Sequence, residues 1–192
     1  MAAGWNRIAR RIRVPLGFAF AIVFLWLARP DELFLACSLI LVVSGLLLRG
    51  YASGYVKKNA ELTTTGPYAH TRNPLYLGSM MIAFGFALAA RSVWIAAILV
   101  VLFAAIYIPV IRAEEQYLRS TFPEFDAYAA HVPRLLPRLI AAGPARNTAQ
   151  NIAQNPGVFS GELYRRHREY NALLGAVGMY AALILKMALL RK

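Results

Sequence analysis

The sequence predicts an all-α integral membrane protein, a bundle of four or five short helices. Hydrophobic residues make up 59% of the 192 residues and charged residues only 16%. A soluble domain of this size could not bury so much apolar surface. The apolar residues are gathered in five runs, and most of the 21 basic residues lie in the polar segments around them. Lipid is therefore the expected solvent for most of the surface.

Each apolar run is expected to form one helix. The runs cover approximately residues 14–28, 33–48, 75–90, 93–111 and 171–190. Several are shorter than the roughly 20 residues that cross a hydrocarbon core. We therefore expect snorkelling side chains or local thinning of the bilayer at their ends. The joins at residues 29–32 and 91–92 are tight, which predicts two antiparallel helical hairpins.

The first and last runs each allow two interpretations. The first follows a basic segment, as in a signal peptide, but it lacks a small-x-small cleavage site and further apolar runs follow. We expect it to be a retained span. The last run contains Lys186 close to its end, from where the ammonium group could snorkel to the interface. We expect this run to span, and a helix lying in the interface is the alternative.

The basic residues are unevenly distributed between the two sides of the predicted bundle. If the N-terminus is cytosolic, sixteen of the 21 lie on the cytosolic side, and the others are Arg29, Arg91, Lys186, Arg191 and Lys192. The positive-inside rule favours this orientation, which places the polar segments 49–74 and 112–170 in the cytosol. Contacts with anionic lipid headgroups then explain the net charge of +12, and no nucleic-acid partner is expected.

The chain divides into a core and a C-terminal extension. Residues 1–140 are expected to form the core with four spans, and residues 141–192 a linker followed by the last helix. Residues 141–161 are rich in Gly, Pro and Asn, which is typical of a linker. The single cysteine, Cys37, excludes an internal disulfide, and we interpret it as a small buried thiol.

Residues 63–79 form the first of two segments that carry candidate functional residues, and they read TTTGPYAHTRNPLYLGS. Asn73 followed by Pro74 predicts the N-cap and first residue of the third helix. Such a helix start presents free backbone N–H groups, which suit a carboxylate-bearing ligand. Gly78 permits close approach of a neighbouring helix. An ordinary helix start at a membrane surface is the alternative.

Residues 112–138 form the second segment, directly after the fourth run. Glu114 and Glu115 lie at the membrane boundary, where unpaired acids are costly. Pairing of Glu115 with Arg119, four residues on, is one interpretation. The tight join at residues 91–92 supports another, because it brings the end of the fourth helix beside the start of the third. Both glutamates would then lie near Asn73 and Tyr76, in a site that fits a zwitterionic ligand bearing hydroxyl groups.

Together these segments resemble a known superfamily. The matching residues are Gly66, Pro67, Tyr68, Arg72, Asn73, Pro74, Tyr76 and Gly78, then Arg112, Glu114, Glu115 and Leu118, then Phe122, Phe125, Tyr128, Val132, Pro133, Arg134 and Pro137. Their spacing over residues 63–138 resembles that of the isoprenylcysteine carboxyl methyltransferase and phospholipid methyltransferase superfamily. Two features depart from its pattern. Asn73 stands where the prenylcysteine enzymes usually carry His, and this chain continues for about 50 residues beyond the Val-Pro-Arg element where many bacterial members stop.

The resemblance implies a cytosolic pocket for S-adenosylmethionine, with S-adenosylhomocysteine as product, open laterally to the bilayer. The residues expected to bind this cofactor are Tyr68, His70, Arg72, Asn73, Pro74, Tyr76, Leu77, Glu114, Glu115 and Leu118. The candidate catalytic residues are Arg134, Glu115 and His70. Arg134 or Arg112 would hold a carboxylate acceptor, whereas Glu114, Glu115 or His70 would take the proton of an amine acceptor. No metal site is expected, because three histidines and one cysteine form no convincing zinc motif.

The leading functional hypothesis is a methyltransferase in a bacterial inner membrane that resembles the isoprenylcysteine carboxyl O-methyltransferases and acts on a lipid-like or prenylated acceptor. N-methylation of a phospholipid headgroup or fatty amine is the first alternative. An NADPH-dependent membrane sterol reductase and a non-enzymatic membrane subunit are the others. The sequence leaves the acceptor and the oligomeric state open.

Overall fold

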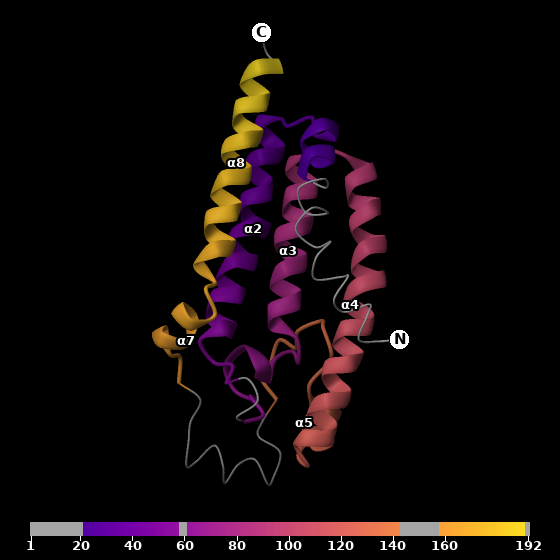
Figure 1. Cartoon of the computed structure of the whole chain (residues 1–192), viewed down its shortest axis with the longest axis vertical. Coiled ribbons are helices and arrows are strands. Elements are labelled where there is room, and N and C mark those ends of the chain that lie inside the picture. The colour runs from indigo at the N-terminus through magenta and orange to yellow at the C-terminus, as the bar shows by residue number, and fades with distance from the viewer. Residues whose placement is uncertain (1–20, 58–60, 143–157, 191–192) are drawn as a thin grey trace, which may run out of the picture.

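The computed structural model describes residues 21–57, 61–142 and 158–190, and within these ranges the chain is helical with no strand. Residues 21–27 end a first helix, and the part of the first predicted run before residue 21 lies outside the described residues. The following elements are α2 (Glu32–Ser53), the 3-10 helix η1 (Gly66–Ala69), α3 (Pro74–Ala89), α4 (Val93–Thr121), α5 (Phe125–His131), α7 (Gly161–Arg166) and α8 (Tyr170–Leu190). The predicted all-α class is confirmed (Figure 1).

Three of these helices, α2, α4 and α8, are long and apolar enough to cross a membrane, while α3 is apolar but has only 16 residues. The prediction of short helices was wrong for α4, which has 29 residues and continues to Thr121. The residues beyond the apolar run are mostly good helix formers, and they extend α4 by its last turns. The helix stops at Thr121 because the next residue, Phe122, precedes Pro123 and has an extended backbone.

Both predicted tight joins lie at one end of the bundle, which we call the join end (residues 28–32 and 90–92). The Asp31 side chain caps α2 by accepting from the Leu33 N–H at 3.0 Å, and Arg91 makes its turn with a φ of 50°. The Arg29 N–H donates to the Ala90 carbonyl at 2.8 Å, which ties the two joins together. The opposite ends of α2, α3 and α4 therefore also lie near one another (Figure 1).

Helices α2 and α3 pack through glycines. A Cβ atom built on Gly45 would lie 2.7 Å from the Gly78 carbonyl oxygen, and one on Gly85 would lie 2.6 Å from a methyl group of Val42. These distances are too short for any side chain, so the two backbones approach each other directly. The close approach that the sequence predicted at Gly78 is confirmed.

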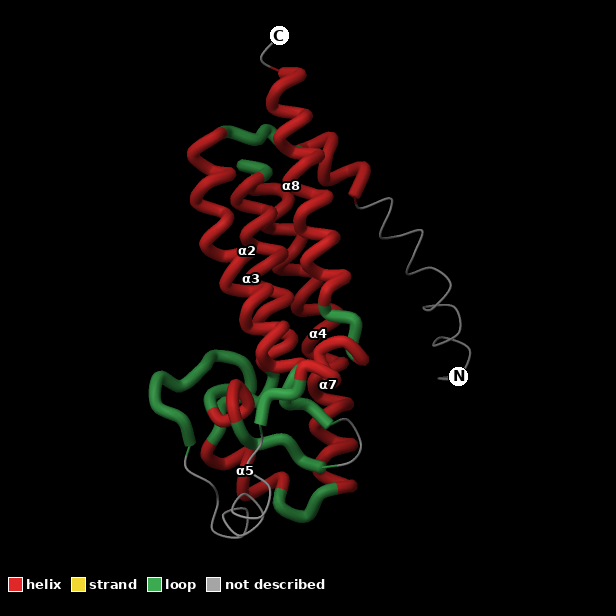
Figure 2. The backbone as a smooth tube through the Cα atoms, turned by 90° about the vertical axis from the view of Figure 1, so that its left-hand side faces the viewer, coloured by secondary structure: helices red, strands yellow, loops and turns green. Residues whose placement is uncertain are grey.

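Helix α8 runs lengthwise beside the bundle (Figures 1 and 2). Its Tyr180 hydroxyl lies 2.7 Å from the Ser38 hydroxyl of α2. Nearer the join end, the Lys186 ammonium group donates to the backbone carbonyls of Leu25, Trp26 and Ala28. These are carbonyls at the C-terminal end of the first helix, where a cation is favourable. Length and direction both fit a span better than an interfacial helix.

Replacing Lys186 by methionine is expected to lower the free energy of unfolding by about 1–2 kcal/mol, because three carbonyls lose a charged donor. The measurement is thermal unfolding of the purified protein in detergent. Lys57→Met is the matched control, since Lys57 forms an exposed pair with Glu61 that is worth less than ~1 kcal/mol. Equal unfolding temperatures for the two variants would contradict the expectation.

Candidate functional site

A cavity of about 420 Å³ lies at the end of the bundle opposite the join end. Segments that are far apart in the sequence enclose it: the ends of α2 and α4, the start of α3, η1, α5 and the residue before α8. Its wall is made by Arg49, Val56, Lys57, Glu61, Leu62, Thr63, Tyr68, Arg72, Asn73, Leu75, Tyr76, Ser79, Tyr107, Glu114, Glu115, Tyr117, Leu118, Phe122, Phe125, Tyr128 and Glu169. Its volume is in the range of small-molecule sites.

Most of the cofactor-binding residues predicted from the sequence lie in this wall. They are Tyr68, Arg72, Asn73, Tyr76, Glu114, Glu115 and Leu118. Pro74, Leu77, His70 and Arg134 do not line the cavity. The predicted neighbourhood of the α3 start and the α4 end is present, and it can be followed directly: the Tyr76 hydroxyl donates to Glu114 at 3.0 Å.

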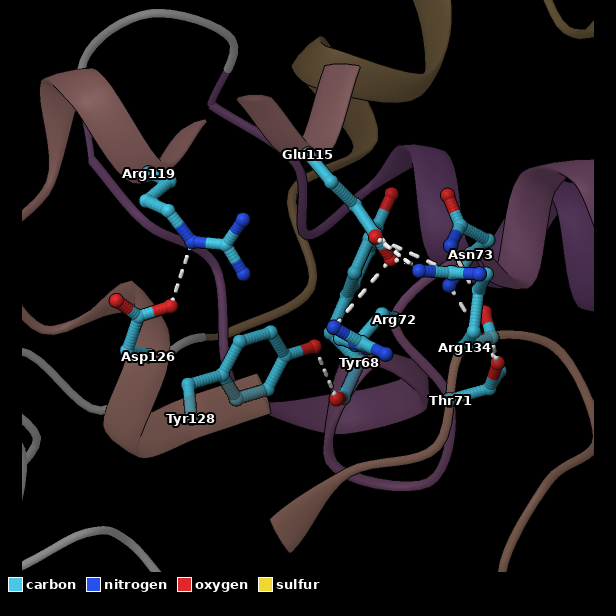
Figure 3. Close-up of polar contacts among 9 residues, drawn as sticks. All are labelled: Tyr68, Thr71, Arg72, Asn73, Glu115, Arg119, Asp126, Tyr128 and Arg134. Carbon is cyan, nitrogen blue, oxygen red and sulfur yellow. Dashed lines mark hydrogen bonds and ion pairs between the residues drawn. The ribbon is translucent and has the colours of Figure 1, made fainter. Parts of the chain in front are cut away.

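Glu115 is the centre of the polar network at the cavity (Figure 3). The residue is only 7% exposed, and its carboxylate accepts from Arg134 Nε at 3.0 Å and Nη2 at 2.8 Å. Arg72 Nη1 lies 3.3 Å from the same carboxylate. These hydrogen bonds raise the pKa of Arg134 above its usual range. The alternative pairing of Glu115 with Arg119 is wrong, because Arg119 pairs with Asp126 at 2.7 Å.

Asn73 has a different role from the predicted cap. It occupies the N-cap position of α3, but its side chain makes no capping hydrogen bond. Its Nδ2 donates instead to the Arg134 carbonyl at 2.8 Å. The Thr71 hydroxyl donates to the Leu135 carbonyl at 3.0 Å, and the Arg72 N–H donates to the Pro133 carbonyl at 2.9 Å. Residues 71–73 thus hold the segment after α5, and with it Arg134, beside Glu115 (Figure 3).

Helix α5 closes the cavity on another side. Phe125 and Tyr128 are buried, and the Tyr128 hydroxyl donates to the Tyr68 carbonyl at 2.7 Å (Figure 3). Burial raises the pKa of both Tyr68 and Tyr128 above the ordinary value, so both hydroxyls stay protonated at neutral pH. Tyr128 is therefore a permanent donor that fixes η1 against α5.

The other two residues considered for acid–base or anchoring roles lie elsewhere. His70 Nδ1 is 2.8 Å from the Arg138 carbonyl oxygen, and the His70 carbonyl accepts from the Arg138 N–H at 2.9 Å. His70 therefore contributes to the loop rather than to the cavity wall. Arg112 is exposed and does not line the cavity.

Two buried polar atoms at the cavity lack a protein partner. They are the Thr63 hydroxyl oxygen and Arg72 Nε, and among the described residues they are the buried side-chain atoms without a hydrogen bond. Buried polar groups are almost always satisfied. Both residues line the cavity, so a polar ligand there would supply the missing hydrogen bonds.

Sequence reasoning missed a second ion pair in the wall. Arg49 donates to Glu169 through Nε and Nη2, both at 3.0 Å, and Nη1 donates to the Ser79 hydroxyl at 2.5 Å. An arginine in the last turns of an otherwise apolar helix was a usable signal. Glu169 had none, because it reaches the site only through the packing of α8.

Within residues 21–57, 61–142 and 158–190, no three His, Cys, Asp or Glu side chains are grouped as metal ligands. The cavity combines carboxylates, guanidinium groups and tyrosines instead. This combination suits a charged organic ligand with several hydroxyl or carboxylate groups.

Comparison with known proteins finds one matching family and two similar proteins. The sequence model of the phospholipid methyltransferase family matches residues 32–124. The nickel-cobalt-cadmium resistance protein NccN of Alcaligenes xylosoxydans xylosoxydans is 45% identical over 89 residues, which are 46% of this chain and 41% of that protein. The cobalt-zinc-cadmium resistance protein CzcN of Cupriavidus metallidurans is 42% identical over 89 residues, 46% of this chain and 40% of that protein.

These alignments span about two fifths of each relative's length. No solved structure matches the chain. The match to the family model begins at the first residue of α2 and ends just after α4, so it includes Asn73, Glu114 and Glu115 but neither Arg134 nor Glu169. Residues 32–124 thus match the phospholipid methyltransferase family, which lies within the isoprenylcysteine carboxyl methyltransferase-like superfamily.

Proposed function

We propose that the chain is a membrane methyltransferase that binds S-adenosylmethionine in the cavity and methylates a lipid-like acceptor. The observation that carries the proposal is the meeting of both motif segments in one cavity wall around Glu115. The family of residues 32–124 supports it independently. The proposed orientation has the N-terminus and the cavity on the cytosolic side, as the distribution of basic residues favours.

The charges of the cavity fit this cofactor. Three basic and four acidic side chains line the wall: Arg49, Lys57, Arg72, Glu61, Glu114, Glu115 and Glu169. Arg134 pairs with Glu115 from outside the wall and makes the numbers of basic and acidic groups equal. Such a site suits a ligand with charges of both signs, and S-adenosylmethionine carries a carboxylate, an ammonium group and a sulfonium. The unpartnered Arg72 Nε and Thr63 hydroxyl would bind its carboxylate and amino groups. Tyr68 and Tyr76 offer aromatic faces to the adenine.

When bound, the cofactor supplies a methyl group that is already activated by the sulfonium. The protein residues then have to align the acceptor and keep water out. Glu115, held by Arg72 and Arg134, and Glu114, hydrogen-bonded to Tyr76, are proposed to fix the cofactor. Carboxyl O-methylation is the proposed reaction, and N-methylation of an amino headgroup is the second candidate.

The names of the two relatives refer to metal resistance, and they do not alter the proposal. The described part of this chain offers no grouped metal ligands. Most of the cavity wall instead lies within the segment that matches the methyltransferase family.

Calorimetry on the purified full chain in lipid nanodiscs tests the cofactor. We expect S-adenosylhomocysteine to bind with one site per chain and NADPH not to bind. Incubation with methyl-labelled S-adenosylmethionine and extracted lipids then tests the reaction. A base-labile product indicates an ester and a base-stable product an N-methyl group. Absence of S-adenosylhomocysteine binding, or binding of NADPH in its place, would overturn the proposal.

A further inference from the structure

The Arg49–Glu169 pair lies in the cavity wall beside the end of α2. Arg49 follows Glu32 by 17 residues on α2, which is roughly 25 Å along the helix axis. This depth is close to the boundary of a hydrocarbon core of about 30 Å. The side chains of Arg49 and Glu169 are 24% and 10% exposed. At this depth the pair lies near the level of the lipid headgroups.

The Arg49 guanidinium is held rigidly in place by α3. Nη1 donates to the Ser79 hydroxyl at 2.5 Å and to the Leu75 carbonyl at 3.4 Å. The stem of the side chain passes over Gly78, where an added Cβ would lie 2.7 Å from Arg49 Cγ. Its Nε and Nη2 edge therefore points in a fixed direction, and such an edge matches a carboxylate or a phosphate in geometry.

Glu169 occupies that edge from outside the segment that matches the family model. It immediately precedes α8 and lies beyond residues 32–124. Arg168, directly before it, has a φ of 53°, a left-handed conformation that costs a non-glycine residue about 1–3 kcal/mol. The turn is fastened to the end of α2, because His167 Nδ1 lies 3.1 Å from the Ser53 carbonyl oxygen. A strained turn thus places the Glu169 carboxylate against the Nε and Nη2 edge of Arg49.

We propose that Arg49 binds the anionic group of the lipid acceptor, a carboxylate or a phosphate, and that Glu169 occupies its guanidinium until the acceptor displaces it. That the bound lipid accepts a methyl group rests on the proposed function. The shared chemistry serves both candidate reactions, since a carboxylate would itself receive the methyl group and a phosphate would anchor an amino headgroup. Arg49 is proposed as the anchor in place of Arg134 and Arg112, because neither of these lines the cavity wall.

The test uses the full chain in phosphatidylcholine membranes with spin-labelled probes. Electron paramagnetic resonance measures how strongly spin-labelled stearate, phosphatidic acid and phosphatidylcholine associate with the protein. Association of the two anionic probes is expressed relative to phosphatidylcholine. Because each variant changes the net charge by one unit, Glu169→Gln is compared with Glu162→Gln, and Arg49→Gln with Arg165→Gln, which make the same change at exposed residues outside the cavity wall. Stearate and phosphatidic acid distinguish a carboxylate from a phosphate.

The two single variants are expected to act in opposite directions. Glu169→Gln frees Arg49, so relative association of one anionic probe should rise about fivefold, and Arg49→Gln should lower it by a similar factor. A pair with a structural role only would make both variants unstable and change anion association in neither direction. Arg49→Gln combined with Glu169→Gln provides a folded protein without the charge pair if a single variant fails to fold, and it should show the low association.

Calorimetry with S-adenosylhomocysteine on the same samples separates the two proposals. If the wild type binds S-adenosylhomocysteine but Glu169→Gln leaves the association of both anionic probes unchanged, the acceptor site is wrong and the proposed function stands. If the wild type does not bind S-adenosylhomocysteine, the proposed function fails, whatever the lipid association shows.

Discussion

Replacing Glu115 by glutamine is expected to abolish methyl transfer and to lower the free energy of unfolding by about 3–5 kcal/mol. The glutamine is nearly isosteric, so the change removes charge rather than volume. Arg72, with a side chain only 14% exposed, would keep its charge and lose its counterion. Arg134 would lose its pair as well, and the segment after α5 would lose its attachment to α4.

Glu114→Gln is the matched control for this prediction. The substitution is the same and one residue away, but Glu114 is exposed and accepts only the Tyr76 hydroxyl in a hydrogen bond among the described contacts. Its effect on stability should be at most about 1 kcal/mol, while cofactor binding weakens. Thermal unfolding and calorimetry with S-adenosylhomocysteine measure the two effects separately. Equal losses of stability in both variants would show that Glu115 is not the centre of the network.

The sequence predicted the helices and the neighbourhood of the site for a simple reason. Apolar runs indicate directly which segments are surrounded by lipid. A join as short as residues 91–92 forces the two helices that it connects to lie side by side and antiparallel. That constraint was enough to bring Tyr76 beside Glu114 across 38 residues. It fixed which ends of the helices meet, and the cavity forms where they meet.

The partners of individual side chains could not be predicted in the same way. Asn73 before Pro74 has the pattern of a helix cap, but its side-chain amide donates instead to the Arg134 carbonyl, 61 residues away. Glu115 has a suitable arginine one turn later, but two arginines from other segments take it. Local spacing lists the possible partners, and only the packing of distant segments selects among them.

The same limit explains why the Arg49–Glu169 pair was not predicted. Arg49 and Glu169 are 120 residues apart, and the predicted linker between the core and α8 gave no information on where the last helix docks. The family model ends at residue 124, so the match to the family could not supply the contact either.

Replacing Gly45 by valine is expected to lower the free energy of unfolding by about 3 kcal/mol, the upper end of typical overpacking costs, and to abolish cofactor binding. The new Cβ would lie 2.7 Å from the Gly78 carbonyl oxygen and 3.0 Å from the Ile82 backbone nitrogen. Backbone atoms of a packed helix cannot rotate away, so α2 and α3 must separate. Arg49 lies one turn after Gly45 and would be drawn away from Ser79.

Gly175→Val in α8 is the matched control, because a Cβ there meets nothing within 4 Å. Its effect on stability should stay within about 0.5 kcal/mol. Thermal unfolding in detergent measures stability, and calorimetry with S-adenosylhomocysteine measures the cavity. If Gly45→Val unfolds at the temperature of Gly175→Val, the helices are not in backbone contact. If it is destabilised but still binds S-adenosylhomocysteine normally, the α2–α3 contact supports the bundle without setting the shape of the cavity.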